Sequence, residues 1–299
     1  MQNTSSPLAS GRAQGSQSTV LLTGKMRERL HHATVHAILL VGACVLMLPL
    51  AWMLSTSLKP RGAVFLFPPQ WIPKPIMWSN FVEALTVQPF HLYFRNTALI
   101  TILSVIGMAL SSSIVAYSFA RLRWWGRDIV FLLVLATMML PSHVTLIPKF
   151  IIFRHLGWLD TFLPMIVPAF FGGSFNIFLL RQFFMTIPLE MDDAAKIDGC
   201  SVLGTYWRII LPQAKPALMA VGIFTFQGSW NDFMRPLIYL QTKSKWTVSV
   251  ALRAFQGEFS TDWNLVMAAS LVSMLPIILL FFFGQKYFIQ GVVFTGVEK

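Results

Sequence analysis

Charged residues are scarce in this 299-residue sequence, in which they make up 12% of the chain, against about 25% in a typical soluble domain. Acidic side chains are the rarest of them, with 12 Asp and Glu against 23 Lys and Arg. Apolar residues make up 55% of the chain and include 26 Phe. This composition argues against an ordinary soluble enzyme and predicts a membrane protein that crosses the bilayer several times.

Cysteine is also scarce, and its placement gives no sign of a disulfide or a metal pair. Cys44 lies in an apolar run, whereas Cys200 lies in a polar segment. The basic residues outnumber the acidic ones, which gives a net charge of +11. Membrane proteins collect Lys and Arg in their loops, and no basic stripe with interleaved aromatics is present, so we expect membrane lipid and no nucleic acid as a partner.

Signatures of catalysis and of an energy source are missing as well. The interiors of the apolar runs lack Asp, Glu, Lys and Arg, and His36 and His143 are the histidines that we consider as candidates there. The pair Gly24-Lys25 is followed by Met26 and does not form a phosphate-binding loop. We therefore predict a transport protein that is not an enzyme and binds no cofactor or metal itself. Another subunit would supply the energy, unless the chain is a facilitator.

Six uncharged or nearly uncharged runs are long enough, with their flanks, to cross a bilayer. They occupy residues 30–58, 96–120, 129–148, 161–180, 216–231 and 264–285. The first run is about twice as long as the apolar core of a cleaved signal peptide, so we expect it to be retained. The predicted fold class is all-α, a polytopic membrane protein with six transmembrane helices in a domain spanning residues 30–292.

The segments outside this domain are polar. Residues 1–29 are rich in Ser, Gln and Gly and predict a disordered cytoplasmic tail, and residues 293–299 form a short cytoplasmic C-terminal tail. Dense positive charge at residues 25–29 and 121–127 favours a cytoplasmic N-terminus. Six spans then place both termini in the cytoplasm. Residues 59–92 predict an outer, interfacial loop.

The segment 182–212 is the most charged internal part of the chain. Pro188 suits the first position of a helix, carboxylates follow in its first turn, and Gly199 is typical of a helix end. A second helical stretch is predicted to stop at Leu211-Pro212. These residues alone leave two alternatives open, a helix that docks on a partner protein and a helix that lies on the membrane surface.

The same segment resembles the coupling loop of binding-protein-dependent ABC importer permeases. The motif of that family has Glu-Ala-Ala, then Gly, then Ile-x-Leu-Pro at fixed spacing. Here Asp193 replaces the usual Glu, which keeps the negative charge on a shorter arm. Two further segments, 230–233 and 285–291, are similar to the smaller permease subunit of maltose-type carbohydrate importers. The full set of coupling residues that the resemblance implies is Glu190, Asp193, Ala194, Ala195, Asp198, Gly199, Ile209, Leu211 and Pro212.

The resemblance implies a type I ABC importer permease fold in a bacterial inner membrane. It also implies a homologous second permease, two cytoplasmic ATPase subunits that hold ATP and Mg, and an extracytoplasmic solute-binding protein that delivers a sugar. Substrate-binding residues are not assigned, and a glycerol phosphate ester is also compatible.

Three alternatives remain beside this interpretation. A self-contained facilitator or secondary carrier would need no ATPase, but it leaves the pattern from Asp193 to Pro212 unexplained. A membrane-embedded scaffold is compatible with the long outer loop. Permeases for amino acids or peptides share the coupling motif.

Overall fold

The computed structural model describes residues 13–141, 143–253, 255 and 261–293, with side chains described between residues 28 and 285. Helices and connecting loops make up these residues, and no β-strand occurs among them. The chain divides into two units, one that ends at Ser55 and one that begins at Thr56. The all-α prediction is thus confirmed for the described part.

The first unit consists of most of helix α1 (Ala13–Ser57). Its part from residue 28 to 57 is apolar enough to span a bilayer. Residues 13–29 are helical, in contrast to the predicted disorder, because the good helix formers of Lys25–Arg29 extend the adjacent apolar helix. Residues 1–12 lie outside the described residues.

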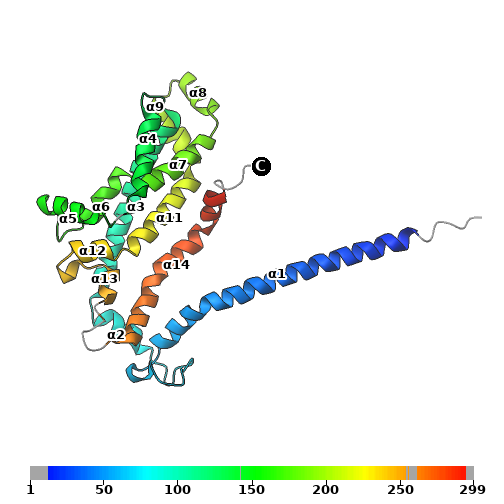
Figure 1. Cartoon of the computed structure of the whole chain (residues 1–299), viewed down its shortest axis with the longest axis vertical. Coiled ribbons are helices and arrows are strands. Elements are labelled where there is room, and N and C mark those ends of the chain that lie inside the picture. The colour runs from blue at the N-terminus through cyan, green and yellow to red at the C-terminus, as the bar shows by residue number, and fades with distance from the viewer. Residues whose placement is uncertain (1–12, 142, 254, 256–260, 294–299) are drawn as a thin grey trace, which may run out of the picture. The chain divides into compact units, whose positions relative to one another are not determined.

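The second unit is built around α3 (Phe90–Arg121), a helix of 32 residues. It packs against α7 (Ser174–Thr186) and α11 (Lys215–Trp230), and α11 packs in turn against α14 (Trp263–Val293) (Figure 1). Polar residues with small side chains, such as Ser112, occupy the buried side of α3. Such residues let helices approach closely in a membrane.

Buried apolar residues concentrate toward the two ends of α3. One cluster surrounds Tyr117 near its C-terminus, together with residues of α7 and of the segment 206–221. The other surrounds Tyr93 near its N-terminus, together with α2 (Ser79–Thr86), α13 (Val248–Arg253) and the start of α14. Each end of the bundle therefore has its own packed core.

Four helical segments are long and apolar enough to cross a membrane, namely residues 28–57, 90–121, 163–186 and 263–285. A fifth is formed if the bent pair 202–213 and 215–230, which meets at 78°, is one span. These segments match five of the six predicted runs, and the count of six stays a prediction.

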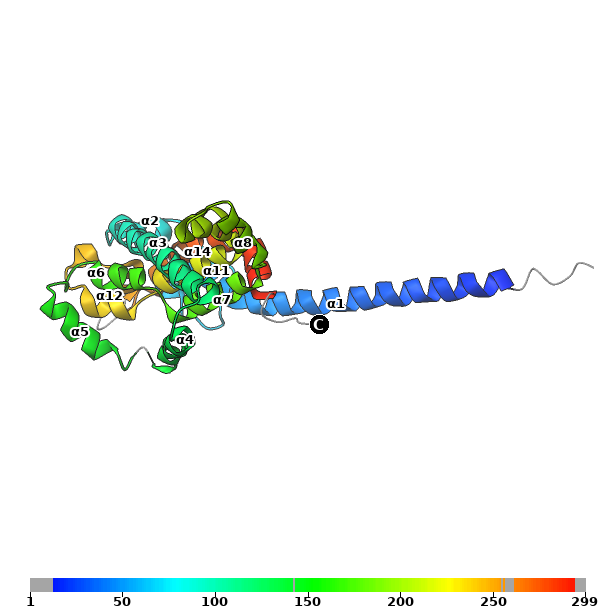
Figure 2. The ribbon, with the colours of Figure 1, turned by 90° about the horizontal axis from the view of Figure 1, so that it is seen from above.

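The remaining predicted run, 129–148, is divided in the structure. Helix α4 (Arg127–Ala136) passes into the short helix η2 (Thr137–Met139), and a second helix, α5 (Leu146–His155), begins after the break. Pro141 lies in the break, where its missing N–H and its ring oppose a continuous helix. Figure 2 shows α4 and α5 at the periphery of the bundle.

The other elements are short. The fourth span consists of α6 (Leu163–Ile166), η3 (Val167–Phe171) and α7, with Gly172 and Gly173 between the last two. The connections contain η1 (Arg61–Ala63), α12 (Met234–Tyr239) and η5 (Lys243–Lys245).

Candidate functional site: the loop between the fourth and fifth spans

Helix α8 (Glu190–Ile197) lies in the predicted coupling loop, at the end of the bundle opposite α2 (Figure 1). Three carboxylates, Glu190, Asp192 and Asp193, occupy its first turn. Carboxylates are favourable there because they face the partial positive charge of the helix N-terminus. The prediction of a helix here is confirmed, but the helix begins at Glu190 and not at Pro188.

The end of α8 is a hydrogen-bonded glycine cap. The N–H of Gly199 donates to the carbonyl of Lys196 at 3.0 Å, and the N–H of Cys200 donates to the carbonyl of Ala195 at 2.9 Å. Gly199 has a φ of 76°, in the left-handed region, which is the usual conformation of a residue just after a helix. A Cβ atom at this position would meet nothing within 4 Å. Within this chain, glycine is therefore favoured by its backbone conformation and not by crowding.

The chain then turns into a second helical stretch. The Ser201 hydroxyl accepts the N–H of Gly204 at 3.1 Å and caps α9 (Val202–Thr205). The π-helix η4 (Tyr206–Ile210) and the short α10 (Leu211–Gln213) follow. The predicted stop at Leu211-Pro212 is wrong by a few residues, because Pro212 lies in the first turn of α10, where no N–H is required.

Arg121, the last residue of α3, lies beneath α8. Its Nη2 atom is 3.4 Å from Oδ2 of Asp192, and the two side chains are only 2% and 11% exposed. The same Nη2 donates to the carbonyl of Pro188 at 3.4 Å. Both charges are removed from water, so each depends on the other for compensation. The first turn of α8 is thereby attached to the end of α3.

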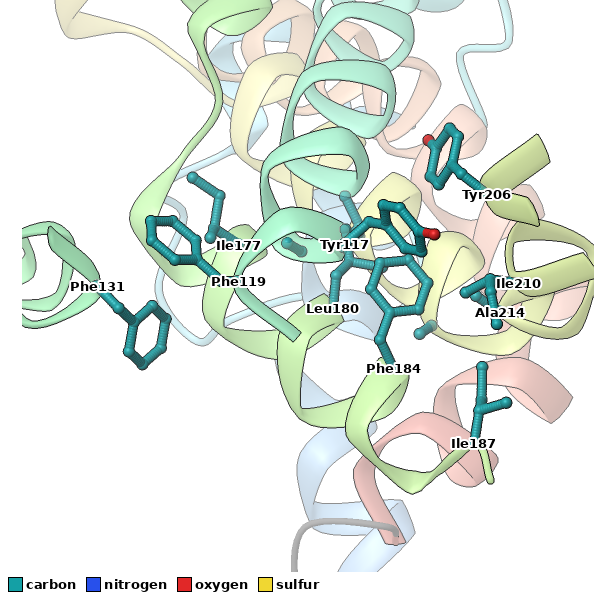
Figure 3. Packing of buried hydrophobic residues seen from close by; sticks show 13 residues of the cluster. Tyr117, Phe119, Phe131, Ile177, Leu180, Phe184, Ile187, Tyr206, Ile210 and Ala214 are labelled. Carbon is teal, nitrogen blue, oxygen red and sulfur yellow. The ribbon is translucent and has the colours of Figure 1, made fainter. Parts of the chain in front are cut away.

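Two tyrosines continue this attachment along α3. The Tyr117 hydroxyl donates to the carbonyl of Val202 at 3.3 Å, and the hydroxyls of Ser113 and Tyr206 are 2.7 Å apart. The rings of Tyr117 and Tyr206 are packed 5.2 Å apart, and Phe184 of α7 meets Tyr117 edge-on (Figure 3). Three successive turns of α3 thus hold the loop, from α8 through η4.

The predicted coupling residues divide into an exposed set and a buried set. Six are exposed, namely Glu190, Asp193, Ala194, Asp198, Gly199 and Pro212. Ala195 is 2% exposed, and Ile209 and Leu211 are half-buried against the apolar cluster around Tyr117. The last three therefore attach the loop to the bundle and leave the first six to face outward.

Apolar residues that the sequence-based prediction missed lie exposed among them. Ile197 is 87% exposed and Leu203 is 64% exposed, and Leu189, Val202 and Trp207 are about half exposed. The alternation of Ile197 with charged neighbours could have identified the first of these, but nothing in the sequence shows that the others lack a partner. Together with the exposed carboxylates they form an apolar surface with an acidic side, which we call the α8 face.

A second polar cluster lies at the other end of α3. The Asp160 carboxylate accepts the backbone N–H groups of Gln241 and Thr242 at 3.0 and 2.9 Å, the Thr242 hydroxyl at 2.7 Å and the Lys245 ammonium at 2.9 Å. These donors, with the Thr242 N–H first and Lys245 next, hold the pKa of Asp160 well below its ordinary value. Asn96 of α3 donates to the same connection, at the carbonyl of Ser244. Residues 239–246 are thus fixed from two sides.

Residues 110–293 match the family model described as the inner membrane component of binding-protein-dependent transport systems. A probable ABC transporter permease protein of Bacillus subtilis, YurM, is 33% identical over 255 residues, which cover 84% of this chain and 83% of the relative. The chain belongs to this family. It is accordingly a multi-pass membrane permease of an ABC transporter, and it is not an enzyme, as the sequence predicted.

Other family members have named substrates. The arabinooligosaccharide permease AraQ of Halalkalibacterium halodurans is 32% identical, with 82% of this chain and 86% of the relative covered. The sulfoquinovosyl glycerol permease SmoH of Agrobacterium fabrum is 30% identical, with 84% and 89% covered. A crystal structure of a bacterial ABC transporter that imports alginate contains a chain with the same fold, at a TM-score of 0.77 and 24% identity, over 88% of this chain and 98% of that chain. The predicted ABC importer permease fold is therefore confirmed.

Proposed function

We propose that this chain is one of two homologous permease subunits of an ATP-driven sugar importer in a bacterial inner membrane. In this proposal, an extracytoplasmic solute-binding protein delivers the sugar, and two cytoplasmic ATPase subunits bind ATP and Mg. Family membership supports the importer, and relatives that transport arabinooligosaccharides and sulfoquinovosyl glycerol support a sugar-like solute. Membership also argues against a self-contained facilitator.

We further propose that the α8 face docks on one ATPase subunit. The observation that carries this proposal is the contrast between the two sides of α8. Its inner side is bound to α3 through Arg121 and Asp192, whereas its outer side exposes Asp193 and the large apolar residue Ile197. Exposed apolar residues with charged neighbours are typical of a protein interface. A helix on the membrane surface would instead carry basic residues on its polar side.

The first test is affinity purification of the tagged chain from native membranes in mild detergent, with the bound proteins identified by mass spectrometry. We expect an ATPase and a second permease. Recovery of this chain alone as a stable, monodisperse species would contradict the proposal.

The docking role of α8 is tested separately by the charge reversal Asp193→Lys. Asp193 is exposed and pairs only with Lys196 of the same helix among the described residues, at 2.9 Å, so the substitution should leave the fold intact. We expect the affinity for the ATPase to fall about tenfold, which corresponds to the ~1.4 kcal/mol of one charge-assisted contact. Asp128→Lys, at an exposed carboxylate in the first turn of α4, is the matched control. Equal co-purification of both variants with the ATPase would argue against a role for Asp193.

A further inference from the structure

The turn between α3 and α4 contains an open pocket with a volume of about 540 Å³. Gly126 has a φ of 82°, a left-handed conformation that favours glycine, and it lets the chain turn from the end of α3 into α4 over residues 122–126. The residues that line the pocket come from this turn and from the start of α4, namely Arg123, Trp124, Gly126, Arg127, Asp128 and Ile129. Two arginines and two apolar side chains thus share one concave surface.

Positive charge exceeds negative charge in this pocket. The Arg127 guanidinium donates to the Asp128 carboxylate at 3.0 Å and to the carbonyl of Leu122 at 3.4 Å, so its position is fixed. Arg123 is exposed, and among the described residues no carboxylate lies at ion-pair distance from it. One of the two arginines is therefore neutralised by a carboxylate, and the other is available to bind an anion.

The bundle behind the pocket supports it and adds a further positive charge. The ring of Trp124 packs 5.8 Å from that of Phe119 on α3, and Phe119 packs 5.3 Å from Phe131 on α4. The guanidinium of Arg181 on α7 lies 4.1 Å from the centre of the Phe131 ring. The hydrogen bond from Arg127 lowers the pKa of Asp128, and the charge of Arg181 lowers this pKa further. Arg181 is thus close enough to contribute to the positive potential of the pocket.

The surroundings of the pocket indicate a lipid as the source of the anion. Trp125, which is 96% exposed, lies beside the pocket in the sequence, and tryptophan is enriched where membrane proteins meet the lipid headgroups. Ile129 lines the pocket and begins an exposed apolar face of α4 that continues through Leu132 and Leu133. Residues three and four positions apart share one face of a helix, and α4 is peripheral in the bundle (Figure 2). A headgroup in the pocket would therefore place its acyl chains along α4.

We propose that this pocket binds the headgroup of an anionic phospholipid, with the phosphate at Arg123 and Arg127 and the acyl chains along the exposed face of α4. Basic pockets beside membrane helices are a recurring type of site for anionic headgroups. A free phosphate would satisfy the same charges but would leave Ile129 and the rest of the apolar face uncovered. The proposal depends on the membrane location of the chain and not on the identity of the transported solute.

The test uses the full chain with the subunits that co-purify with it, in nanodiscs of phosphatidylcholine. A trace of phosphatidylglycerol with a photoreactive acyl chain is the probe, and phosphatidylcholine with the same photoreactive chain is the reference. After illumination, peptide mass spectrometry measures the yield of lipid adducts at residues 122–136. The competitors are unlabelled phosphatidylglycerol in the nanodisc and inorganic phosphate in the buffer.

Three variants separate the charge of the pocket from charge elsewhere. Arg123→Gln removes the available positive charge, whereas Arg123→Lys retains it. Arg208→Gln is the matched control, because Arg208 is also an exposed arginine but lies in η4 and does not line the pocket. Since both arginines are exposed, we expect all three variants to fold.

We expect the phosphatidylglycerol probe to label residues 122–136 more than the phosphatidylcholine reference does. Unlabelled phosphatidylglycerol should suppress this labelling, and inorganic phosphate should not. Arg123→Gln should lower the yield about fivefold, which corresponds to the ~1 kcal/mol that one basic residue contributes near an anionic lipid surface. Arg123→Lys and Arg208→Gln should retain most of the native yield.

Several outcomes would overturn the lipid site. Equal labelling by the two probes would mean that the contact does not depend on the charge of the lipid, and absence of labelling would mean that protein covers the pocket. Suppression by inorganic phosphate would identify a free anion as the ligand. An unchanged yield in Arg123→Gln, or an equal loss in Arg208→Gln, would exclude the assigned role of Arg123. The comparisons between probes and between competitors use the native chain, so they decide the question even if a variant does not assemble.

Discussion

The Arg121 guanidinium is almost completely withdrawn from water beneath α8, and its carboxylate partner Asp192 is nearly as buried. The pair meets at ion-pair distance without a full hydrogen bond, since Oδ2 of Asp192 has no hydrogen-bond donor in the described structure. Such a pair adds little net stability compared with apolar residues of the same size, but loss of one member leaves an uncompensated buried charge.

We therefore expect Arg121→Met to lower the free energy of unfolding by about 3 kcal/mol, because the buried Asp192 carboxylate then lacks its partner. The double variant Arg121→Met/Asp192→Leu should recover most of this loss, since it removes both charges. Unfolding in denaturant, followed in detergent for the two variants, measures the difference. A loss in the double variant as large as that in Arg121→Met, or larger, would mean that the two side chains do not compensate each other.

The hydrogen bonds that the Asp160 carboxylate accepts predict that the stability of the protein depends on pH. Its donors, the Thr242 N–H first and Lys245 next, favour the charged carboxylate and lower its pKa in the folded state. The stabilisation is therefore complete above the ordinary pKa of 3.8 and is lost as the pH falls through the lower pKa of the folded state.

We expect Asp160→Asn to reduce thermal stability near neutral pH and to converge on the native protein as the pH falls below about 4. Melting temperatures across this range, in the same detergent, provide the comparison. If the melting temperatures of the two proteins differ by the same amount at every pH, the charge of the Asp160 carboxylate is not the cause of the stabilisation.

Substitutions at Gly199 distinguish the effect of backbone conformation on transport from the effect of docking on transport. Because a Cβ atom meets nothing within this chain, a side chain costs only the left-handed backbone, about 1 kcal/mol for most residues and less for Asn. We expect Gly199→Asn to insert and transport, and Gly199→Asp to insert but not transport, since a fourth exposed carboxylate, beside those of Glu190, Asp193 and Asp198, would enter the proposed docking surface. Uptake by membrane vesicles with matched protein levels measures both. Normal uptake by Gly199→Asp would contradict docking at this turn.

At the scale of elements, the sequence predicted what depends on local chemistry. Helix α8 was predicted because acidic residues in a first turn and a terminal Gly199 have local causes. The second and sixth spans were predicted because a long uncharged run within a membrane must form a helix, in which the backbone N–H and C=O groups bond to one another. The division of the run 129–148 was not predicted, since Pro141 can be tolerated inside a membrane helix when neighbours satisfy the freed carbonyl.

The candidate site was predicted only in part, for a related reason. Spacing identified α8 and its exposed residues, but it could not show that Ala195 and Leu211 face the bundle. The contacts of Arg121 with Asp192, and of Asp160 with Lys245, join residues about 70 and 85 positions apart along the chain. None of these four residues is distinguished by its neighbours in the sequence, so the two pairs follow from tertiary packing alone.

At the scale of the molecule, the two native cysteines provide a test of topology. Cys200 lies at the end of α8, and Ser244 lies at the opposite end of α3, beside Asn96. If α8 is cytoplasmic, a membrane-impermeant maleimide should label Cys200 in inverted vesicles and not in intact spheroplasts, in a Cys44→Ala background. Ser244→Cys, in a background without either native cysteine, should show the reverse. Labelling of Cys200 in intact spheroplasts would contradict the predicted orientation.

The length of α3 connects the loop that contains α8 with the middle of the spans. Arg121 at its end and Ser104 near its middle are separated by 17 residues of one unbroken helix, a distance of about 25 Å. A helix of this kind is stiff along its axis, so it acts as a lever. A tilt of about 5° imposed at α8 would displace the middle of α3 by about 2 Å, enough to separate the Ser104 hydroxyl from the carbonyl of Met165.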